Sequence, residues 1–185
     1  MHRFTTIVSV ISPAAGEIVD AVAAGAANVT AVRQAHVEAG GEPSRRRLAW
    51  AEAARGRNIY TLVDFDPAQP LVDAWVARLG GDPHAMDTVS GVVGQGGLAE
   101  YFLVADDVAG ERVHWYHGLL HSLAPRRVVP IESRPASVVD SLAHLRPSPP
   151  FPDAATLVRA ALSYVPTGLS ADASDEPATL VIDVG

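Results

Sequence analysis

Two amino acids are missing from this chain of 185 residues: it contains no cysteine and no lysine, and all fourteen basic residues are arginine. Without cysteine, the protein has no disulfide, no thiolate nucleophile and no cysteine-held zinc or iron–sulfur cluster. Without lysine, it has no Schiff-base amine and no phosphate-binding lysine of the Walker type. A composition rich in alanine and arginine is typical of a bacterial genome of high GC content. Whatever their origin, the two absences exclude several classes of enzyme.

An excess of positive charge is also missing, because the formal net charge is -7. An acidic chain binds poorly to the phosphate backbone of nucleic acids and to anionic membranes, so we expect neither as a partner. The apolar stretch near the N-terminus covers only about eight residues, too few for a signal peptide or a membrane span. We therefore expect a cytoplasmic protein. With 48% hydrophobic residues, a chain of this length can bury one core.

The N-terminal third is predicted to hold one strand and two helical stretches. Residues 4–11 are nearly all β-branched or apolar, and Ser12-Pro13 is a typical helix start. Apolar side chains spaced by three and four then predict a helix that runs to His36 and that Gly25 can divide in two. A further helix is expected over residues 44–53.

The clearest strand-to-helix unit lies in the middle of the chain. Residues 58–65 are rich in β-branched and aromatic side chains, which predicts a strand. Asp66-Pro67 then opens a helix with one apolar stripe. The consecutive glycines Gly80-Gly81 are expected to end that helix.

The next segment changes to three short β-prone runs separated by turn sequences. The runs are 88–93, 98–106 and 111–118, and they predict a three-stranded antiparallel meander. Residues 127–132 predict another strand, placed at a sheet edge because Pro130 has no N–H group. The expected fold is therefore α+β, close to α/β: a mixed sheet with a central antiparallel meander and helices packed on it.

The C-terminal part is predicted to be an appendage of the same domain. Residues 1–146 form the expected α/β core domain, and a proline-rich linker follows. A helix capped by an aspartate is expected over 153–164. Residues 179–184 read TLVIDV and predict a last strand that pairs with a sheet edge of this molecule or of another. We therefore expect residues 147–185 to pack on the core domain.

Three of the seven histidines, His114, His117 and His121, fall within eight residues. On a helix, positions i, i+3 and i+7 share one face, so the three imidazoles can hold Zn²⁺ or another divalent metal. On a strand, His114 faces away from the other two, and the imidazoles then bond to backbone or water. The β-prone aromatic residues between them favour the strand. The metal site therefore depends on whether residues 111–121 form a helix or a strand.

Asp64 and Asp66 follow a predicted strand, where α/β enzymes place their chemistry, and Asp106 and Asp107 end another. Together these carboxylates can hold Mg²⁺ against a phosphate. A structural alternative explains them as well, because Asp66 can cap the helix that follows and Asp107 can belong to a turn.

The pair Asp64 and Asp66 after an apolar strand resembles the first motif of phosphatases of the haloacid dehalogenase type. The later pair, Asp106 and Asp107, is similar to the metal-binding motif of that family. The resemblance implies that Asp64 is a nucleophile, and it covers only these two short stretches. The chain departs from the family pattern at Ala68, where Thr or Val is usual, and in having no lysine and only about forty residues between the pairs.

A glycine-rich stretch and a run of arginines are further candidates for binding. The glycines can cradle a phosphate with backbone N–H groups, but neither standard spacing of a phosphate loop is present, so a hairpin turn is the better interpretation. The arginines can hold a phosphate, an RNA or an acidic partner, and otherwise form a solvated surface. The two groups are Gly94, Gly96 and Gly97, and Arg45, Arg46 and Arg47.

Because each candidate catalytic group also has an ordinary structural explanation, the leading hypothesis is noncatalytic. It is a protein-binding or assembly subunit of an intracellular bacterial complex, which contacts a protein partner or a second copy of itself and needs no cofactor. The alternative is a metal-dependent hydrolase of a phosphorylated small molecule or nucleotide, with Zn²⁺ or Mg²⁺. It would use Asp64, Asp66 and Asp106, or the three histidines. An enzyme needs these groups to converge in a pocket, whereas an assembly subunit needs an exposed apolar patch or an unpaired strand edge.

Overall fold

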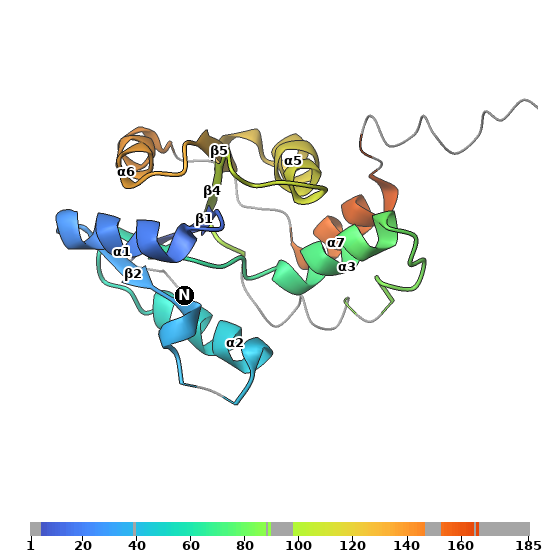
Figure 1. Cartoon of the computed structure of the whole chain (residues 1–185), viewed down its shortest axis with the longest axis horizontal. Coiled ribbons are helices and arrows are strands. Elements are labelled where there is room, and N and C mark those ends of the chain that lie inside the picture. The colour runs from blue at the N-terminus through green and yellow to red at the C-terminus, as the bar shows by residue number, and fades with distance from the viewer. Residues whose placement is uncertain are drawn as a thin grey trace, which may run out of the picture.

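The computed structural model describes residues 5–38, 40–87, 89, 98–146, 153–164 and 166. In this part of the chain, five parallel strands form one sheet in the order β2-β3-β1-β4-β5 (Figure 1). The strands are β1 (Thr6–Ile11), β2 (Val29–Val32), β3 (Tyr60–Val63), β4 (Tyr101–Ala105) and β5 (Val128–Ile131). The helices are α1 (Ala15–Gly25), η1 (Gln34–His36), α2 (Glu42–Ala53), α3 (Gln69–Leu79), η2 (His114–Leu120), α5 (His121–Leu123), η3 (Pro125–Arg127), α6 (Pro135–His144) and α7 (Ala154–Ser163).

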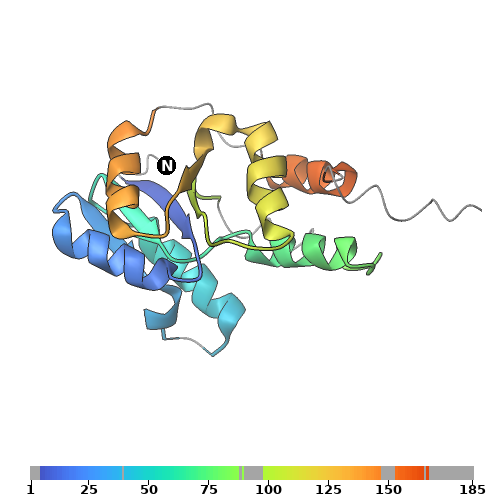
Figure 2. The same cartoon turned by 45° about the horizontal axis from the view of Figure 1, so that its top comes forward.

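Helices cover both faces of the sheet (Figure 2). The connection from β1 to β2 runs toward one edge of the sheet. The later connections, from β2 to β3, β3 to β4 and β4 to β5, all run toward the other edge. Since crossovers between parallel strands are right-handed, helices of the two directions lie on opposite faces. One apolar core packs α1, and with it α6 after the last strand β5, on the sheet through residues such as Ile18 and Leu142. The other core packs α2, α3, η2 and α7 through Trp50, Trp75 and Trp115.

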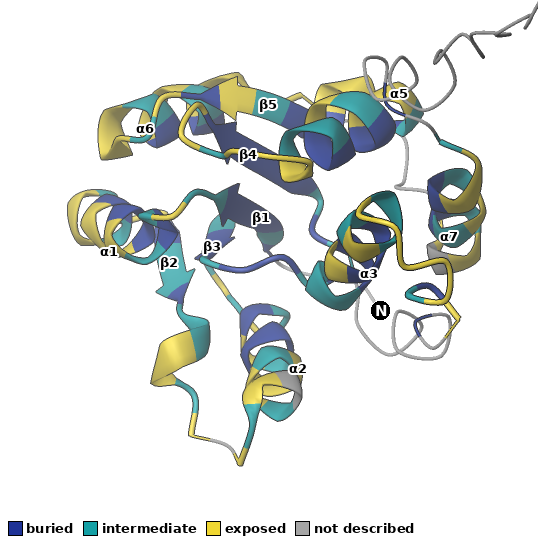
Figure 3. Ribbon diagram, turned by 45° about the vertical axis from the view of Figure 1, so that its right-hand side comes forward, coloured by how far each residue is buried: buried dark blue, intermediate teal, exposed yellow. Residues whose placement is uncertain are grey.

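The central strands are buried on both faces, as Figure 3 shows by colour. All five residues of β4 are buried, and so are the four middle residues of β1. A strand covered by helices on both faces needs a continuous apolar run rather than alternation, and YFLVA and IVSV have that pattern. The runs at residues 4–11 and 58–65 are confirmed as strands β1 and β3.

The predicted antiparallel meander is wrong, because all five described strands are parallel. Within the run 98–106, β4 forms between β1 and β5, with Val8 opposite Tyr101. The run 111–118 is not a strand, since η2 starts at His114. Tertiary packing outweighs the β propensity of this run. In the helical form, one face carries four buried side chains, those of Trp115, Tyr116, Leu119 and Leu120. Apart from Val89, the run 88–93 lies outside the described residues.

The prediction that the first helix continues beyond Gly25 to His36 is also wrong. Helix α1 ends at Gly25, and the next residues form the edge strand β2. Val29 and Val32 are both buried, at the two ends of a strand of four residues paired with β3. Their spacing of three fits a helical stripe equally well, so only the pairing with β3 distinguishes the two structures.

Several expected boundaries are confirmed. Helix α3 ends before Gly81, whose φ of +104° is a backbone conformation that favours glycine. Strand β5, with Pro130, lies at the sheet edge. The carboxylate of Asp153 accepts the backbone N–H of Thr156 at 2.7 Å and so caps α7.

Helix α7 packs on the rest of the molecule through Leu157 and Ala161, which belong to the same apolar core as Trp75 of α3. The expected linker at 147–152 and the expected strand at 179–184 lie outside the described residues. None of the helices in the described ranges is long and apolar enough to cross a membrane.

Candidate functional site

The carboxyl ends of the parallel strands form one edge of the sheet, and the candidate aspartates lie on it. Asp64 and Asp66 follow β3, and Asp106 follows β4. The direction of the connections reverses between β1 and β4: the chain leaves β1 toward β2, and it leaves β4 toward β5 on the other side. In open α/β sheets, ligands bind in the crevice outside the strand ends at such a reversal.

A hollow of about 380 Å³ opens at this reversal, and we call it the carboxyl-edge hollow. Its walls are formed by the last residues of β1, by the residues that follow β1, β3 and β4, and by the first turn of α3. Apolar side chains form much of its wall, and a few polar groups face the same space. The lining residues are Val10, Ile11, Ser12, Pro13, Asp64, Phe65, Asp66, Gln69, Val108, Ala109 and Arg112.

Both carboxylate oxygens of Asp64 hold the segment after β2. The backbone N–H of Gln34 donates to Oδ1 at 2.8 Å, and Nε of Arg33 donates to Oδ2 at 3.3 Å. Arg33 also pairs with Asp20 of α1 at 2.9 Å. The guanidinium packs so closely on Gly16 that a Cβ added there would lie 2.0 Å from Nη2. Asp64 therefore joins the ends of β2 and β3, through Arg33, to the first turns of α1.

Asp66 is almost completely buried, with 2% of its surface exposed. The backbone N–H of Ala68 donates to Oδ1 at 2.7 Å and closes the turn before α3. The hydroxyl of Tyr116 donates to Oδ2 at 2.7 Å. Burial raises the pKa of Asp66, and the bonds from Tyr116 and Ala68 partly oppose that rise. Burial, followed by the nearby Asp66, raises the pKa of Tyr116, so its phenol keeps the proton that it donates.

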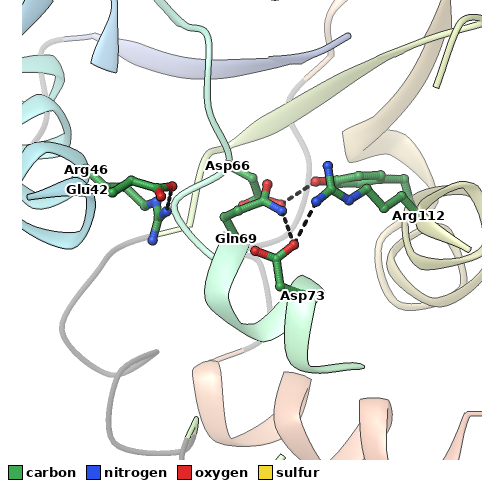
Figure 4. A network of polar contacts seen from close by, with 7 residues as sticks. Glu42, Arg46, Asp66, Gln69, Asp73 and Arg112 are labelled. Carbon is green, nitrogen blue, oxygen red and sulfur yellow. Dashed lines mark hydrogen bonds and ion pairs between the residues drawn. The ribbon is translucent and has the colours of Figure 1, made fainter. Parts of the chain in front are cut away.

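A second polar group lies beside Asp66, as Figure 4 shows, and two of its members, Gln69 and Arg112, line the hollow. Asp73 of α3 accepts one bond from Nε2 of Gln69 at 2.7 Å and one from Arg112 at 2.8 Å, both on Oδ1. Arg112 and Asp73 are each about half exposed, so this ion pair contributes about 0 to 1 kcal/mol. The pair connects α3 to the turn that leads into η2.

A third group joins the ends of β1, β4 and β5. The hydroxyl of Ser12 contacts Asp107 Oδ2 at 3.1 Å and Ser133 Oγ at 2.9 Å, and it accepts the backbone N–H of Ala14. The backbone N–H of Ser133 donates to Asp106 Oδ1 at 3.0 Å. Asp106 and Asp107 therefore each bond to a group in another loop at this edge.

The structure thus brings Asp64, Asp66 and Asp106 to one edge but engages each of them in a different set of hydrogen bonds. Within the ranges that the structure describes, no three histidine, aspartate or glutamate side chains form a group that can hold a metal ion. The carboxylates instead connect the loops that surround the hollow.

The three histidines lie on the helical segment η2 and α5, but η2 is a π-helix, in which positions i and i+3 are turned further apart around the axis than on the α-helix that the metal hypothesis needs. They are not among any metal-holding group of the described residues. The inner face of this segment carries buried aromatic and leucine side chains, while His117 and His121 are exposed on the outside. Partial burial, and then the neighbouring His121, lower the pKa of His117.

The arginine run is divided by the helix that carries it. Arg45 and Arg47 are exposed, whereas Arg46 turns inward and pairs with Glu42 at 2.6 Å. The three side chains therefore do not form one basic patch. The glycines Gly94, Gly96 and Gly97 lie outside the described residues.

At the opposite, amino edge of the sheet lies an apolar groove of about 340 Å³. The ends of α1, β2, β3 and α6 form it, and none of its lining residues is charged. Ile59 and Val139 at this groove are 59% and 45% exposed. We call this surface the apolar groove; its residues are Ala26, Asn28, Val29, Ile59, Tyr60, Val139, Leu142 and Ala143.

Sequence reasoning missed four residues that complete the carboxyl edge: Arg33, Gln69, Arg112 and Tyr116. Arg33 and Arg112 carry no local motif, and Tyr116 fits a strand as well as a helix. The one usable signal for residues of this edge was a position directly after a predicted strand. That signal identifies Ser12, which follows β1, in the same way as Asp64, which follows β3.

Comparisons with family models, with curated proteins and with solved structures each gave no match. The resemblance to phosphatases of the haloacid dehalogenase type therefore has no support beyond its two short stretches.

Proposed function

We propose that this protein is a noncatalytic assembly subunit that associates with a second copy of itself through the apolar groove. The observation that carries the proposal is the exposure of Ile59 and Val139, which line the apolar groove together with other uncharged residues. Large exposed apolar surfaces on a folded protein mark contact sites. At the other edge, the bonding of Asp64 and Asp66 to loop groups supports a structural rather than a catalytic use of these carboxylates.

A second copy fits this surface for two reasons. The protein carries a net charge of -7, so two copies repel each other over most approaches, and an uncharged patch is where they can meet. The patch also combines projecting side chains with a concavity. A two-fold contact uses the same patch on both copies, so Ile59 of each can enter the groove of the other.

Replacing Ile59 with aspartate is expected to weaken the dimer at least about tenfold, equivalent to about 1.4 kcal/mol. The reason is that a carboxylate would have to lose water in an apolar contact. Sedimentation velocity over a concentration series gives the dissociation constant, and Val139→Asp should act in the same direction.

The matched control is Leu48→Asp, because Leu48 on α2 is 47% exposed but does not line the groove. It should leave the dissociation constant unchanged, and thermal melts should show all three variants folded. A wild-type protein that sediments as a monomer at every concentration would overturn the proposal. Equal weakening by Leu48→Asp would show that the groove is not the contact.

The hydrolase alternative is tested separately. We expect wild-type protein with added Mg²⁺ or Zn²⁺ to hydrolyse phosphomonoesters and nucleotides no faster than Asp64→Asn, because Asp64 is bonded to Arg33 and Gln34 and belongs to no metal group among the described residues. A screen with generic phosphatase and nuclease substrates measures this. Activity that depends on metal and is lost in Asp64→Asn would instead establish the enzyme.

A further inference from the structure

The carboxyl-edge hollow lies at the other edge of the sheet from the apolar groove, so what it binds is independent of the proposed self-association. Its position at the reversal of strand order is where open α/β sheets bind small ligands. Its volume of about 380 Å³ lies within the range of small-molecule sites, and its mixture of apolar wall and few polar groups is also typical of them.

The charges around the hollow favour a positively charged ligand. The arginines at this edge are already paired with carboxylates: Arg112 with Asp73, and Arg33 with Asp64 and Asp20. An anionic ligand would therefore share either guanidinium with a carboxylate that already neutralises its charge.

Asp66 is the buried acid of the hollow, and its two hydrogen bonds come from neutral donors, the hydroxyl of Tyr116 and a backbone N–H. Among the described residues it forms no ion pair. Arg46 acts on Asp66 only through its more distant charge and is itself paired with Glu42. Each carboxylate oxygen has a second lone pair, so Asp66 can accept a further bond from a ligand.

We propose that the carboxyl-edge hollow binds a small organic cation, with its ammonium or amidinium group on Asp66 and its apolar body against Phe65 and Val108. Phe65 is buried and Val108 partly buried, and both line the same hollow as Asp66. A cation there supplies the opposite charge that the buried carboxylate lacks. Tyr116, which holds Asp66 in place, belongs to the π-helical segment η2, a local geometry that is frequent at functional sites.

Benzamidine is the probe, because it joins an amidinium to a small apolar ring, and benzamide is its neutral counterpart of nearly the same shape. A titration of full-length, isotope-labelled protein followed by amide NMR signals gives both affinities. Benzamidine should bind saturably and at least about tenfold more tightly than benzamide. The shifted signals should belong to residues 11, 12, 14, 64–66, 68, 69 and 108–112; the prolines at positions 13 and 67 have no amide N–H and give no signal.

Two variants test the site by different means. Asp66→Asn keeps an oxygen for the Ala68 N–H but removes the charge, and it should weaken benzamidine binding at least about tenfold. Ala109→Phe fills the hollow without touching Asp66 and should weaken benzamidine and benzamide alike, which keeps the test decisive if Asp66→Asn does not fold. The control Asp140→Asn removes an exposed carboxylate on α6 and should have no effect.

Equal affinities for benzamidine and benzamide would overturn the proposal, as would benzamidine binding that Ala109→Phe leaves unchanged. Saturable binding of inorganic pyrophosphate at the same signals, with none of benzamidine, would show an anion site instead. Because none of these variants lies in the apolar groove, the outcome does not depend on whether the protein dimerises.

Discussion

Replacing Trp75 with alanine is expected to lower the free energy of unfolding by about 3 to 5 kcal/mol, the usual cost of removing a buried aromatic side chain. Trp75 of α3 is fully buried and connects three helices. Its ring meets that of Trp115 of η2 edge to face, with centroids 5.5 Å apart, and lies 6.2 Å from that of Tyr164 after α7. Removing it leaves a cavity where α3, η2 and α7 meet.

The control for this prediction is Trp75→Phe. The indole N–H of Trp75 has no hydrogen-bond partner among the described residues, so phenylalanine loses packing but no hydrogen bond. We expect it to cost less than Trp75→Ala, because it leaves a smaller cavity. Urea unfolding at one fixed protein concentration measures both variants, because self-association would otherwise change the apparent stability. A loss of less than 1 kcal/mol in Trp75→Ala would contradict the packing described for α7.

Tyr116→Phe is expected to destabilise the protein by about 1.5 to 3 kcal/mol at neutral pH and by less in acid. The variant removes the hydroxyl that donates to the buried carboxylate of Asp66 at 2.7 Å. A hydrogen bond to an ionised group contributes more than one to a neutral group, so the loss is largest when Asp66 is charged.

The direction of the pH dependence follows from the pKa of Asp66. Burial raises this pKa above its ordinary value of 3.8, so the folded protein keeps a proton that the unfolded chain has lost. The retained proton favours the folded state, and this contribution of Asp66 to the free energy of unfolding is lost as the pH rises from about 3.8 through the raised pKa. Without the Tyr116 hydroxyl the pKa rises further, so the loss continues to higher pH. The difference between wild type and variant should thus widen with pH and then level off.

Urea unfolding of both proteins at several pH values between acid and neutral measures this difference. Tyr60→Phe, measured at one fixed protein concentration because Tyr60 lines the apolar groove, is the matched control, since its hydroxyl donates to the neutral backbone carbonyl of Leu142 at 3.1 Å. Its cost of about 0.5 to 1.5 kcal/mol should be the same at every pH. A Tyr116→Phe cost that does not change with pH would show that Asp66 is not ionised in the folded protein over that range.

The candidate site was predictable only in part. Asp64, Asp66 and Asp106 were identified because each follows an apolar run, and such runs become strands whose ends share an edge. Their roles were not predictable, because the groups that bind them come from distant parts of the chain. Arg33 reaches Asp64 over 31 residues and Tyr116 reaches Asp66 over 50.

Local sequence determined where most elements lie. Continuous apolar runs became β1 and β3, Gly81 followed the end of α3, and Asp153 capped α7, because these signals act within a few residues. They operate in the same way wherever the segment lies in the fold.

Tertiary structure alone decided that the strands run parallel, and it decided whether each of two ambiguous segments forms a helix or a strand. Residues 29–32 became a strand because β3 pairs with them, and Trp115 and Tyr116 became helical because both can then enter the core. A short β-prone run buries apolar surface as a strand or as a helix, and its own residues favour neither strongly enough. The difference in free energy comes from partners that are distant in sequence, and those same partners bring the carboxyl edge together.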